Sequence, residues 1–196
     1  MALDIETSNF SYEIGGWDKT HLFEPIIVAT WDGDEGHIFS KEDIELSGMT
    51  SHPLHPRDIG EHLEKHVDGG GRIIGHNICG FDLPILRDAL DCHYAGVLLN
   101  KAKELVVDTA RTLRNAAGYG VPLDDVCKTT LGEGKVSMGS ADAPLAWREG
   151  RYAEVAKYCV EDCKMNLDLF NHGREHGVVK SRNVSTGIID DIEVLW

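Results

Sequence analysis

The sequence has no long apolar run and few cysteines. No apolar segment approaches the roughly 18 residues of a membrane-spanning helix, which excludes that class of protein. The five cysteines are odd in number and form no Cys-x-x-Cys pair, so free thiols are expected rather than a disulfide scaffold. The start, Met1-Ala2-Leu3-Asp4, lacks the basic and apolar regions of a secretory signal. We therefore expect a globular protein of the reducing cytoplasm.

Basic residues are also scarce. There are 19 lysines and arginines against 33 acidic residues, which gives a net charge of −14. A protein that coats nucleic acid or an anionic membrane needs the opposite balance. Residues 1–98 hold 6 basic and 18 acidic side chains, whereas residues 99–196 hold 13 and 15. A polyanionic partner is therefore expected to meet mainly the second half, and some of the carboxylates could hold divalent cations.

No repeat, low-complexity tract or linker divides the chain, which predicts a single domain over residues 1–196. Apolar and β-branched segments predict five strands, at residues 2–5, 24–31, 36–40, 72–76 and 104–107. Four-residue apolar spacing and glycine stops predict helices at 56–67, 81–90, from about 108, and over most of 123–172. Gly173 and Gly177 are expected to end the last helix, before a terminal hairpin. Strands that alternate with helices indicate an α/β fold.

The first candidate functional pattern is Asp4-Ile5-Glu6, at the end of the first predicted strand. Alternation along a strand places both carboxylates on one face, within reach of one cation. The same tripeptide occurs at 43–45 and 191–193. The second copy follows Ser40, which has the character of a helix N-cap with acidic residues in the first turn, and the third lies in an acidic tail. Only the first copy is therefore a candidate site.

Two further patterns lie in the middle and near the end of the chain. The segment Gly75 to Asp82 joins a buried strand to a helix, with Asn77 in the turn and Asp82 in the first helical turn. By themselves, a left-handed turn residue and a helix-dipole acid explain both. Tyr158 and Asp162 are four residues apart on the longest predicted helix, so they share a face. That pair, too, is common on ordinary helices.

Taken in chain order, the three patterns resemble the DEDD superfamily of 3′–5′ exonucleases. Asp-x-Glu on a first strand, Asn-x-x-x-Phe-Asp and a late Tyr-x-x-x-Asp form its pattern, and the tyrosine indicates the DEDDy branch of polymerase proofreading domains and RNase D. The resemblance includes Val107-Asp108-Thr109 and the turn Leu131-Gly132-Glu133-Gly134-Lys135, and it covers nearly the whole chain. In one departure, only three residues precede Asp4, so the first strand is expected to be short or completed by another segment.

The resemblance implies an RNase H-like fold, a mixed five-stranded sheet with an antiparallel second strand and helices on both faces. Residues 1 to about 175 would form the exonuclease core, and residues from about 176 to 196 a hairpin extension. It implies two Mg²⁺ or Mn²⁺ ions held by Asp4, Glu6, Asp82 and Asp162, with Tyr158 orienting the attacking water. Residues near the terminal nucleotide would be Thr7, His76, Asn77 and Phe81.

The expected activity is metal-dependent release of mononucleotides from a single-stranded or frayed 3′ end, with a polymerase or helicase as a possible partner. DNA is favoured because the Leu-Gly-x-x-Lys turn resembles proofreading domains more than RNase D. The alternatives are an RNA 3′–5′ exonuclease, a catalytically idle RNase H-like module that binds a polymerase or helicase, and an RNase H-like endonuclease. Candidate phosphate contacts in the less acidic half are Arg111, Arg114, Lys128 and Lys135.

Overall fold

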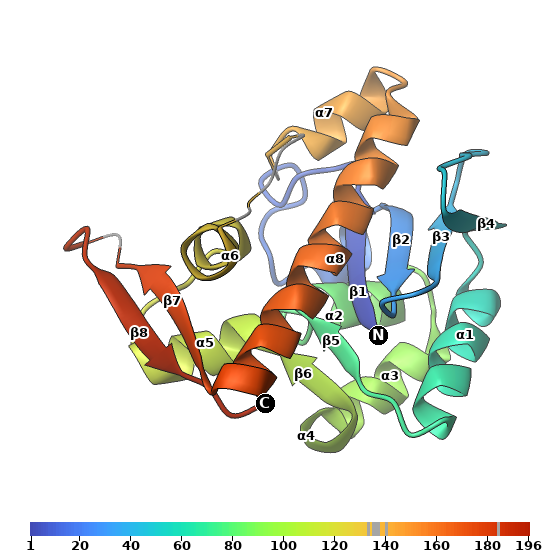
Figure 1. The fold of residues 1–196 in the computed structure, drawn as a ribbon. Helices are drawn as coiled ribbons and strands as arrows, with labels where there is room; N and C mark the ends of the chain where they lie inside the picture. The colour runs from blue at the N-terminus through green and yellow to red at the C-terminus, as the bar shows by residue number, and fades with distance from the viewer. Residues whose placement is uncertain (133, 135–137, 140, 184) are drawn as a thin grey trace.

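A mixed sheet with the strand order β4-β3-β2-β1-β5-β6 forms the centre of the molecule (Figure 1). The computed structural model describes residues 1–132, 134, 138–139, 141–183 and 185–196. The strands of this sheet are β1 (Ala2–Thr7), β2 (Pro25–Trp31), β3 (Gly36–Ser40), β4 (Met49–Pro53), β5 (Ile73–Gly75) and β6 (Val106–Asp108). The helices are α1 (Pro56–Asp68), α2 (Asp82–Asp88), α3 (His93–Asn100), α4 (Ala102–Leu105), α5 (Thr109–Ala117), α6 (Leu123–Leu131), α7 (Ala143–Arg148) and α8 (Tyr152–His176), with a 3₁₀ turn at Thr20–Leu22.

The predicted α/β class is confirmed, and the number of strands is corrected from five to six. β2 is antiparallel to both β1 and β3, as expected, whereas β1–β5, β5–β6 and β3–β4 are parallel pairs. The additional strand is β4, at the sheet edge beside β3. Its sequence Met-Thr-Ser-His-Pro has no apolar alternation and its side chains are mostly exposed, so it carries no strand pattern. Backbone pairing with β3 orders it, together with stacking of His52 on His37 and Phe39.

The helix expected after Ser40 does not form. Residues 41–48, all of which are described, contain no helix. The Ser40 hydroxyl instead accepts a hydrogen bond from the Glu42 backbone N–H at 3.2 Å, two residues on. Serine satisfies a nearby N–H in this way in turns as well as at helix N-caps, so the residue pattern alone did not separate the two.

The two faces of the sheet have different covers because side chains alternate along each strand. Ala2, Ile27 and Ala29 face a core that includes Val155, Cys159 and other residues of α8. Residues of opposite parity face a second core with α1, α2 and α3; these residues are Leu3, Ile5, Val28 and Phe39. Helix α8 therefore lies on one face, the face that receives even-numbered side chains of β1 (Figure 1). Within the described residues, no helix has both the length and the apolar character required to cross a bilayer.

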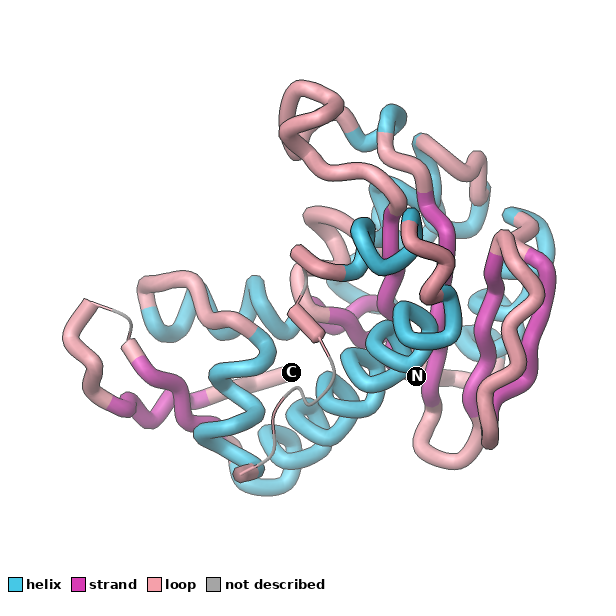
Figure 2. Tube along the Cα trace, turned by 90° about the horizontal axis from the view of Figure 1, so that it is seen from above, coloured by secondary structure: helices cyan, strands magenta, loops and turns pink. Residues whose placement is uncertain are grey.

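The predicted terminal hairpin is present as a second, two-stranded sheet, with β7 (Val178–Arg182) antiparallel to β8 (Ile189–Glu193). It forms a separate group of strands in Figure 2. The hairpin docks on α6: the Asp125 carboxylate accepts from the Ser181 hydroxyl at 3.1 Å and from the Arg182 N–H at 2.8 Å. The hydroxyls of Thr129 and Thr130 both donate to the Lys180 carbonyl. The hairpin thus fixes the position of α6.

Helix α8 does not end at Gly173, as the sequence suggests, but continues to His176, where Gly177 adopts a left-handed conformation with φ of 72°. Gly173 is a close-packing position inside the helix, because a Cβ atom there would lie 2.5 Å from the Trp196 ring. The Trp196 indole N–H donates to the Phe170 carbonyl at 3.0 Å. The absence of a side chain at Gly173 therefore accommodates the C-terminal segment rather than terminating the helix.

Replacing Gly173 by alanine should lower the melting temperature by several degrees, since the Trp196 ring must move to admit the methyl group. Gly96 is the matched control, because it also lies inside a helix but a Cβ there would be 3.7 Å from the nearest Arg87 carbon, an ordinary contact. Gly96→Ala should raise the melting temperature by about 2–4 °C, from about 1 kcal/mol of helix propensity. Calorimetry on both variants checks this. An equal rise in melting temperature for both variants would show that the Trp196 ring moves aside without loss of stability.

Candidate active site

One cleft, with a volume of about 760 Å³, is lined by every residue that the sequence predicts for the site. These residues are Asp4, Glu6, Thr7, His76, Asn77, Phe81, Asp82, Tyr158 and Asp162. They come from β1, from the turn between β5 and α2 together with the first residue of α2, and from α8. Three patterns that are far apart in the sequence therefore line the same cavity, which none of the patterns could show by itself.

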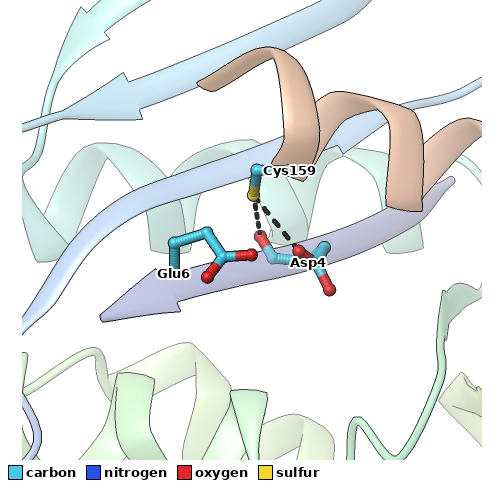
Figure 3. A group of neighbouring side chains, drawn as sticks. All are labelled: Asp4, Glu6 and Cys159. Carbon is cyan, nitrogen blue, oxygen red and sulfur yellow. Dashed lines mark hydrogen bonds between the residues drawn. The ribbon is translucent and has the colours of Figure 1, made fainter. Parts of the chain in front are cut away.

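The first strand supplies two carboxylates to the face of the sheet that α8 covers. Asp4 and Glu6 have the same parity as Ala2, so both side chains point toward α8 (Figure 3). Ligand atoms of Asp4, Glu6 and Cys159 all lie within 4.8 Å of one another. The Cys159 thiol donates to the Asp4 carbonyl at 3.4 Å and lies 3.3 Å from the Asp4 carboxylate. The expectation that alternation places Asp4 and Glu6 together is confirmed.

The third carboxylate, Asp82, joins the start of α2 to β1. Its Oδ1 atom accepts a hydrogen bond from the Ile5 backbone N–H at 3.1 Å. β1 pairs with β5 at only one position, Ala2 with Ile74, so the Ile5 N–H is available for this side chain. Asp82 is 4% exposed. It is thus a buried carboxylate at the cleft as well as an acidic residue in the first turn of a helix.

Helix α8 supplies Tyr158 and Asp162, which lie one turn apart on the face that meets β1. Both are buried. The Tyr158 hydroxyl is hydrogen-bonded to Asp162, and burial, followed by the charge of Asp162, raises the pKa of Tyr158. The phenol therefore stays protonated and can donate a hydrogen bond. The same helix carries Cys159 on the adjacent flank, where it contacts Asp4.

The carboxylates in this cleft are in an environment that disfavours their ionised forms. Burial raises the pKa of Asp4 well above its ordinary value, and the charges of Asp162, Asp82 and Glu6 raise it further. Burial also raises the pKa of Asp82 to about 7, against the opposing effect of its backbone hydrogen bonds. Desolvation and like charges both disfavour the ionised form of a carboxylate. A cation in the cleft would relieve both effects.

The donor set fits a hard divalent cation such as Mg²⁺ or Mn²⁺, which prefers oxygen ligands. Five carboxylates line the cleft, and the pKa values of two of them, Asp4 and Asp82, are raised by their surroundings. The neighbouring Cys159 is no thiolate, because burial raises its pKa well above the ordinary value. A neutral thiol is a poor metal ligand, so the sulfur atom is better described as a hydrogen-bond donor to Asp4.

The predicted substrate-binding residues have mixed structural duties. The His76 ring links β5 to its neighbours: Nε2 donates to the Val121 carbonyl at 2.9 Å, and Nδ1 lies 3.0 Å from the Thr109 hydroxyl. Thr7 is buried and its hydroxyl donates to the Asn9 carbonyl at 3.0 Å. Asn77 is exposed and has φ of 67°, the left-handed turn conformation. Their roles toward a nucleotide stay predictions.

The turn that carries Asn77 is held by Asp108, at the end of β6. The Asp108 carboxylate accepts from the backbone N–H groups of Asn77 and Cys79, each at 3.1 Å, and from that of Arg111 at 2.9 Å. The last of these bonds makes it the N-cap of α5. Asp108, at the end of β6, therefore has a structural role, because its carboxylate holds the turn before α2 and caps α5.

Sequence reasoning missed one wall of the cleft. Phe10, Tyr12, Trp17 and Phe23 line it, from the segment between β1 and β2. That segment reads as polar, yet three aromatic residues within eight positions, 10 to 17, were a signal that could have been used. Asp124, at the start of α6, also lines the cleft.

Three of the four predicted phosphate contacts belong to the described residues, and these three are not in the cleft lining. Arg111 lies at a separate cavity of about 190 Å³, and Lys128 is paired with Asp124 at 2.7 Å. Arg114 lies on α5, outside both linings. Lys135, together with Glu133 of the Leu-Gly-x-x-Lys turn, is outside the described residues. Contact of these side chains with nucleic acid beyond the cleft stays a prediction.

Asp82→Asn should stabilise the metal-free protein at pH 8. The asparagine Oδ1 can still accept from Ile5, but the ionised carboxylate is gone. Because the pKa of Asp82 is about 7 when folded and near 3.8 when unfolded, ionisation opposes folding as pH rises from 4 to above 7. The melting temperature in EDTA should therefore rise by several degrees at pH 8 and by less at pH 5.

Asp191→Asn is the control for this prediction, because Asp191 is exposed on β8. Its melting temperature should match that of the wild-type protein at both pH values. A loss of stability in Asp82→Asn at pH 8 would contradict the conclusion that burial and neighbouring charges disfavour the ionised form of Asp82.

Neither a protein-family model nor a curated protein matches this chain.

Proposed function

We propose that the protein is a metal-dependent 3′–5′ exonuclease of the DEDDy type, with an RNase H-like fold. The observation that carries the proposal is the meeting of Asp4, Glu6, Asp82, Tyr158 and Asp162 in one cleft. Chance matches to three short patterns would scatter over the surface. A six-stranded mixed sheet flanked by helices is compatible with that fold, with β4 as an addition at the edge.

Each of these residues would have a separate part in phosphodiester hydrolysis. Asp4 and Glu6 would hold cations from β1, Asp162 from α8 and Asp82 from α2. Bound Mg²⁺ or Mn²⁺ would supply an activated water and neutralise charge on the phosphate in the transition state. The Tyr158 hydroxyl, beside Asp162, would orient the attacking water by a hydrogen bond. A raised pKa keeps that hydroxyl protonated, so it acts as a donor rather than a base.

The rival functions differ in what the cleft must contain. An idle module that only binds a polymerase or helicase would not need the buried carboxylates, which destabilise the metal-free cleft and are all retained. An RNA 3′–5′ exonuclease needs the same groups as a DNA exonuclease, so sugar preference is the closer question. DNA is our choice of substrate, on the resemblance to proofreading domains.

Matched 5′-labelled DNA and RNA oligonucleotides, digested with Mg²⁺ and with Mn²⁺, test the proposal directly. A ladder that shortens from the 3′ end establishes the direction, and the faster substrate establishes the sugar preference. Internal cuts of a circular substrate would instead support an endonuclease. An intact oligonucleotide with both metals would contradict the proposed activity.

Asp4→Ala and Asp162→Ala should each abolish hydrolysis, because each removes an oxygen ligand from the shared site. Asp43→Ala and Asp191→Ala are matched controls from the duplicate Asp-Ile-Glu copies, and both of these residues are exposed. Their rates in the labelled-oligonucleotide assay should stay near wild type. If Asp43→Ala were as inactive as Asp4→Ala, the assignment of the metal site to the first Asp-Ile-Glu copy would be wrong.

Tyr158→Phe should lower kcat by roughly 10- to 1,000-fold with little change in KM, because the ring is kept and one positioning hydroxyl is lost. Steady-state kinetics measures both constants. The affinity for the metal, measured by calorimetric titration, should be unchanged because the phenol is not a ligand. A wild-type rate for Tyr158→Phe, with Asp162→Ala still inactive, would remove the tyrosine from the mechanism and leave the metal site in place.

A further inference from the structure

The cleft has an unusual balance of charge for a nucleic-acid site. Among the described residues that line it, five are carboxylates and none is lysine or arginine. Proteins that hold a phosphate backbone normally do so with cations, and their binding is strongly salt-dependent. Bound cations at the carboxylates would neutralise a reacting phosphate, but nothing in the described lining extends that attraction along a strand.

The same cleft is rich in aromatic side chains, and two of them are conspicuously exposed. Tyr12 is 74% exposed and Trp17 is 67% exposed. Both lie on the segment between β1 and β2, and both line the cleft. Exposed large apolar side chains that are gathered in one place mark binding surfaces, whereas single exposed apolar side chains are common and need no explanation. Their flat faces suit nucleobases.

These two rings are held in place by other aromatic rings. Tyr12 stacks on Phe10, with centroids 5.0 Å apart and planes 14° apart. Trp17 packs edge-on against Phe81, at 5.6 Å and 68°, and against Phe23 at 6.1 Å. An aromatic surface that is already ordered loses little side-chain entropy when a ligand binds. Tyr12 and Trp17 are thus two supported platforms rather than loose side chains.

One residue outside the cleft lining, Arg148, fixes the segment that carries these platforms. Arg148, at the end of α7, makes a bidentate ion pair with Glu13 at 2.9 and 2.6 Å. It also donates to the Ser8 carbonyl at 2.9 Å and lies over the Phe10 ring, 5.5 Å from its centroid. Planar arginine can satisfy all of these partners at once, which lysine cannot. Arg148 is the positioning residue of the Tyr12 platform.

From these observations we infer that Tyr12 and Trp17 each stack an unpaired base of a single-stranded nucleic acid, and that Arg148 holds the Tyr12 side of this surface in position. The inference rests on the proposed function, and it specifies the substrate as a strand with at least two unpaired nucleotides, recognised without regard to sequence. Stacking is tolerant of base identity because every base has a π-face. Unlike phosphate contact, it neutralises no phosphate and so releases no counterions, which is the source of salt dependence. Binding outside the metal site therefore depends on bases.

The test compares two fluorescent ten-nucleotide probes of equal charge, oligo(dT) and its fully abasic counterpart. Equilibrium binding is measured by anisotropy in Ca²⁺, whose oxygen coordination suits the carboxylates, and gels confirm that the probes stay intact. The variants are Tyr12→Ala, Trp17→Ala and Arg148→Ala, with Tyr12→Phe and Trp17→Phe as conservative partners. Ile188→Ala, 61% exposed on the hairpin loop, controls for loss of an exposed apolar side chain.

Wild-type protein should bind oligo(dT) at least about 10-fold more tightly than the abasic probe. Each alanine variant at a platform should weaken oligo(dT) binding by about 5- to 100-fold and leave abasic binding unchanged. Tyr12→Phe, Trp17→Phe and Ile188→Ala should behave as wild type. Arg148→Ala should also weaken only oligo(dT) binding, which a general loss of structure would not do. Raising salt from about 50 to 200 mM should change the wild-type dissociation constant by less than about threefold.

The outcomes separate this inference from the proposed function. If Mg²⁺-dependent hydrolysis is present but the alanine variants bind oligo(dT) as tightly as the wild-type protein, the platforms are wrong and the exonuclease stands. If hydrolysis is absent but the preference for oligo(dT) is present and is reduced in each alanine variant, the platforms stand without the exonuclease. Equal wild-type binding of both probes, binding of neither probe, or a steep salt dependence would overturn the inference.

Discussion

Repulsion among buried carboxylates is the constraint on which the arrangement of this structure depends. Burial raises the pKa values of Asp4 and Asp82, and the charge of Asp162 raises both further. All three residues line one cleft. A cluster of this kind forms only where other interactions stabilise it. The alternating apolar side chains of β1 and β2 supply them, because they bury one face against α8 and the other against α1, α2 and α3.

Specific hydrogen bonds then place each charged group. The Ile5 N–H fixes Asp82, and the Cys159 thiol fixes Asp4. Asp108, outside the cleft, is bonded to the backbone of the turn that precedes α2. The metal-free cleft therefore combines a rigid frame with an unfavourable charge distribution. A preorganised site commonly lowers the stability of the protein in this way.

The class of fold could be predicted from local patterns, because alternation and four-residue spacing report directly on which face is buried. Asp4 and Glu6 were assigned to one face in this way. The meeting of the three patterns at one site was expected only from their resemblance to the exonucleases. β4 could not be found, since it is ordered by pairing with β3 and by contacts with residues of other segments, and its own sequence has no strand pattern. Gly173 was taken for a helix stop because the sequence does not show Trp196 packed against it. The aromatic wall of the cleft was missed because the segment between β1 and β2 is mostly polar, and its sequence does not show that its aromatic side chains gather at the cleft.

The contact between Cys159 and Asp4 joins residues 155 positions apart. Such a separation makes closure of the cleft a late event in folding, after the more local pairing of β1, β2 and β3. During synthesis at about 5–20 residues per second, Asp4 leaves the ribosome about 8–30 s before the α8 residues that complete its surroundings. A nascent chain therefore holds β1 carboxylates that are still solvated and far from Asp162. The charge repulsion described above arises only when the chain is nearly complete, so it acts on the finished protein and not on its early folding steps.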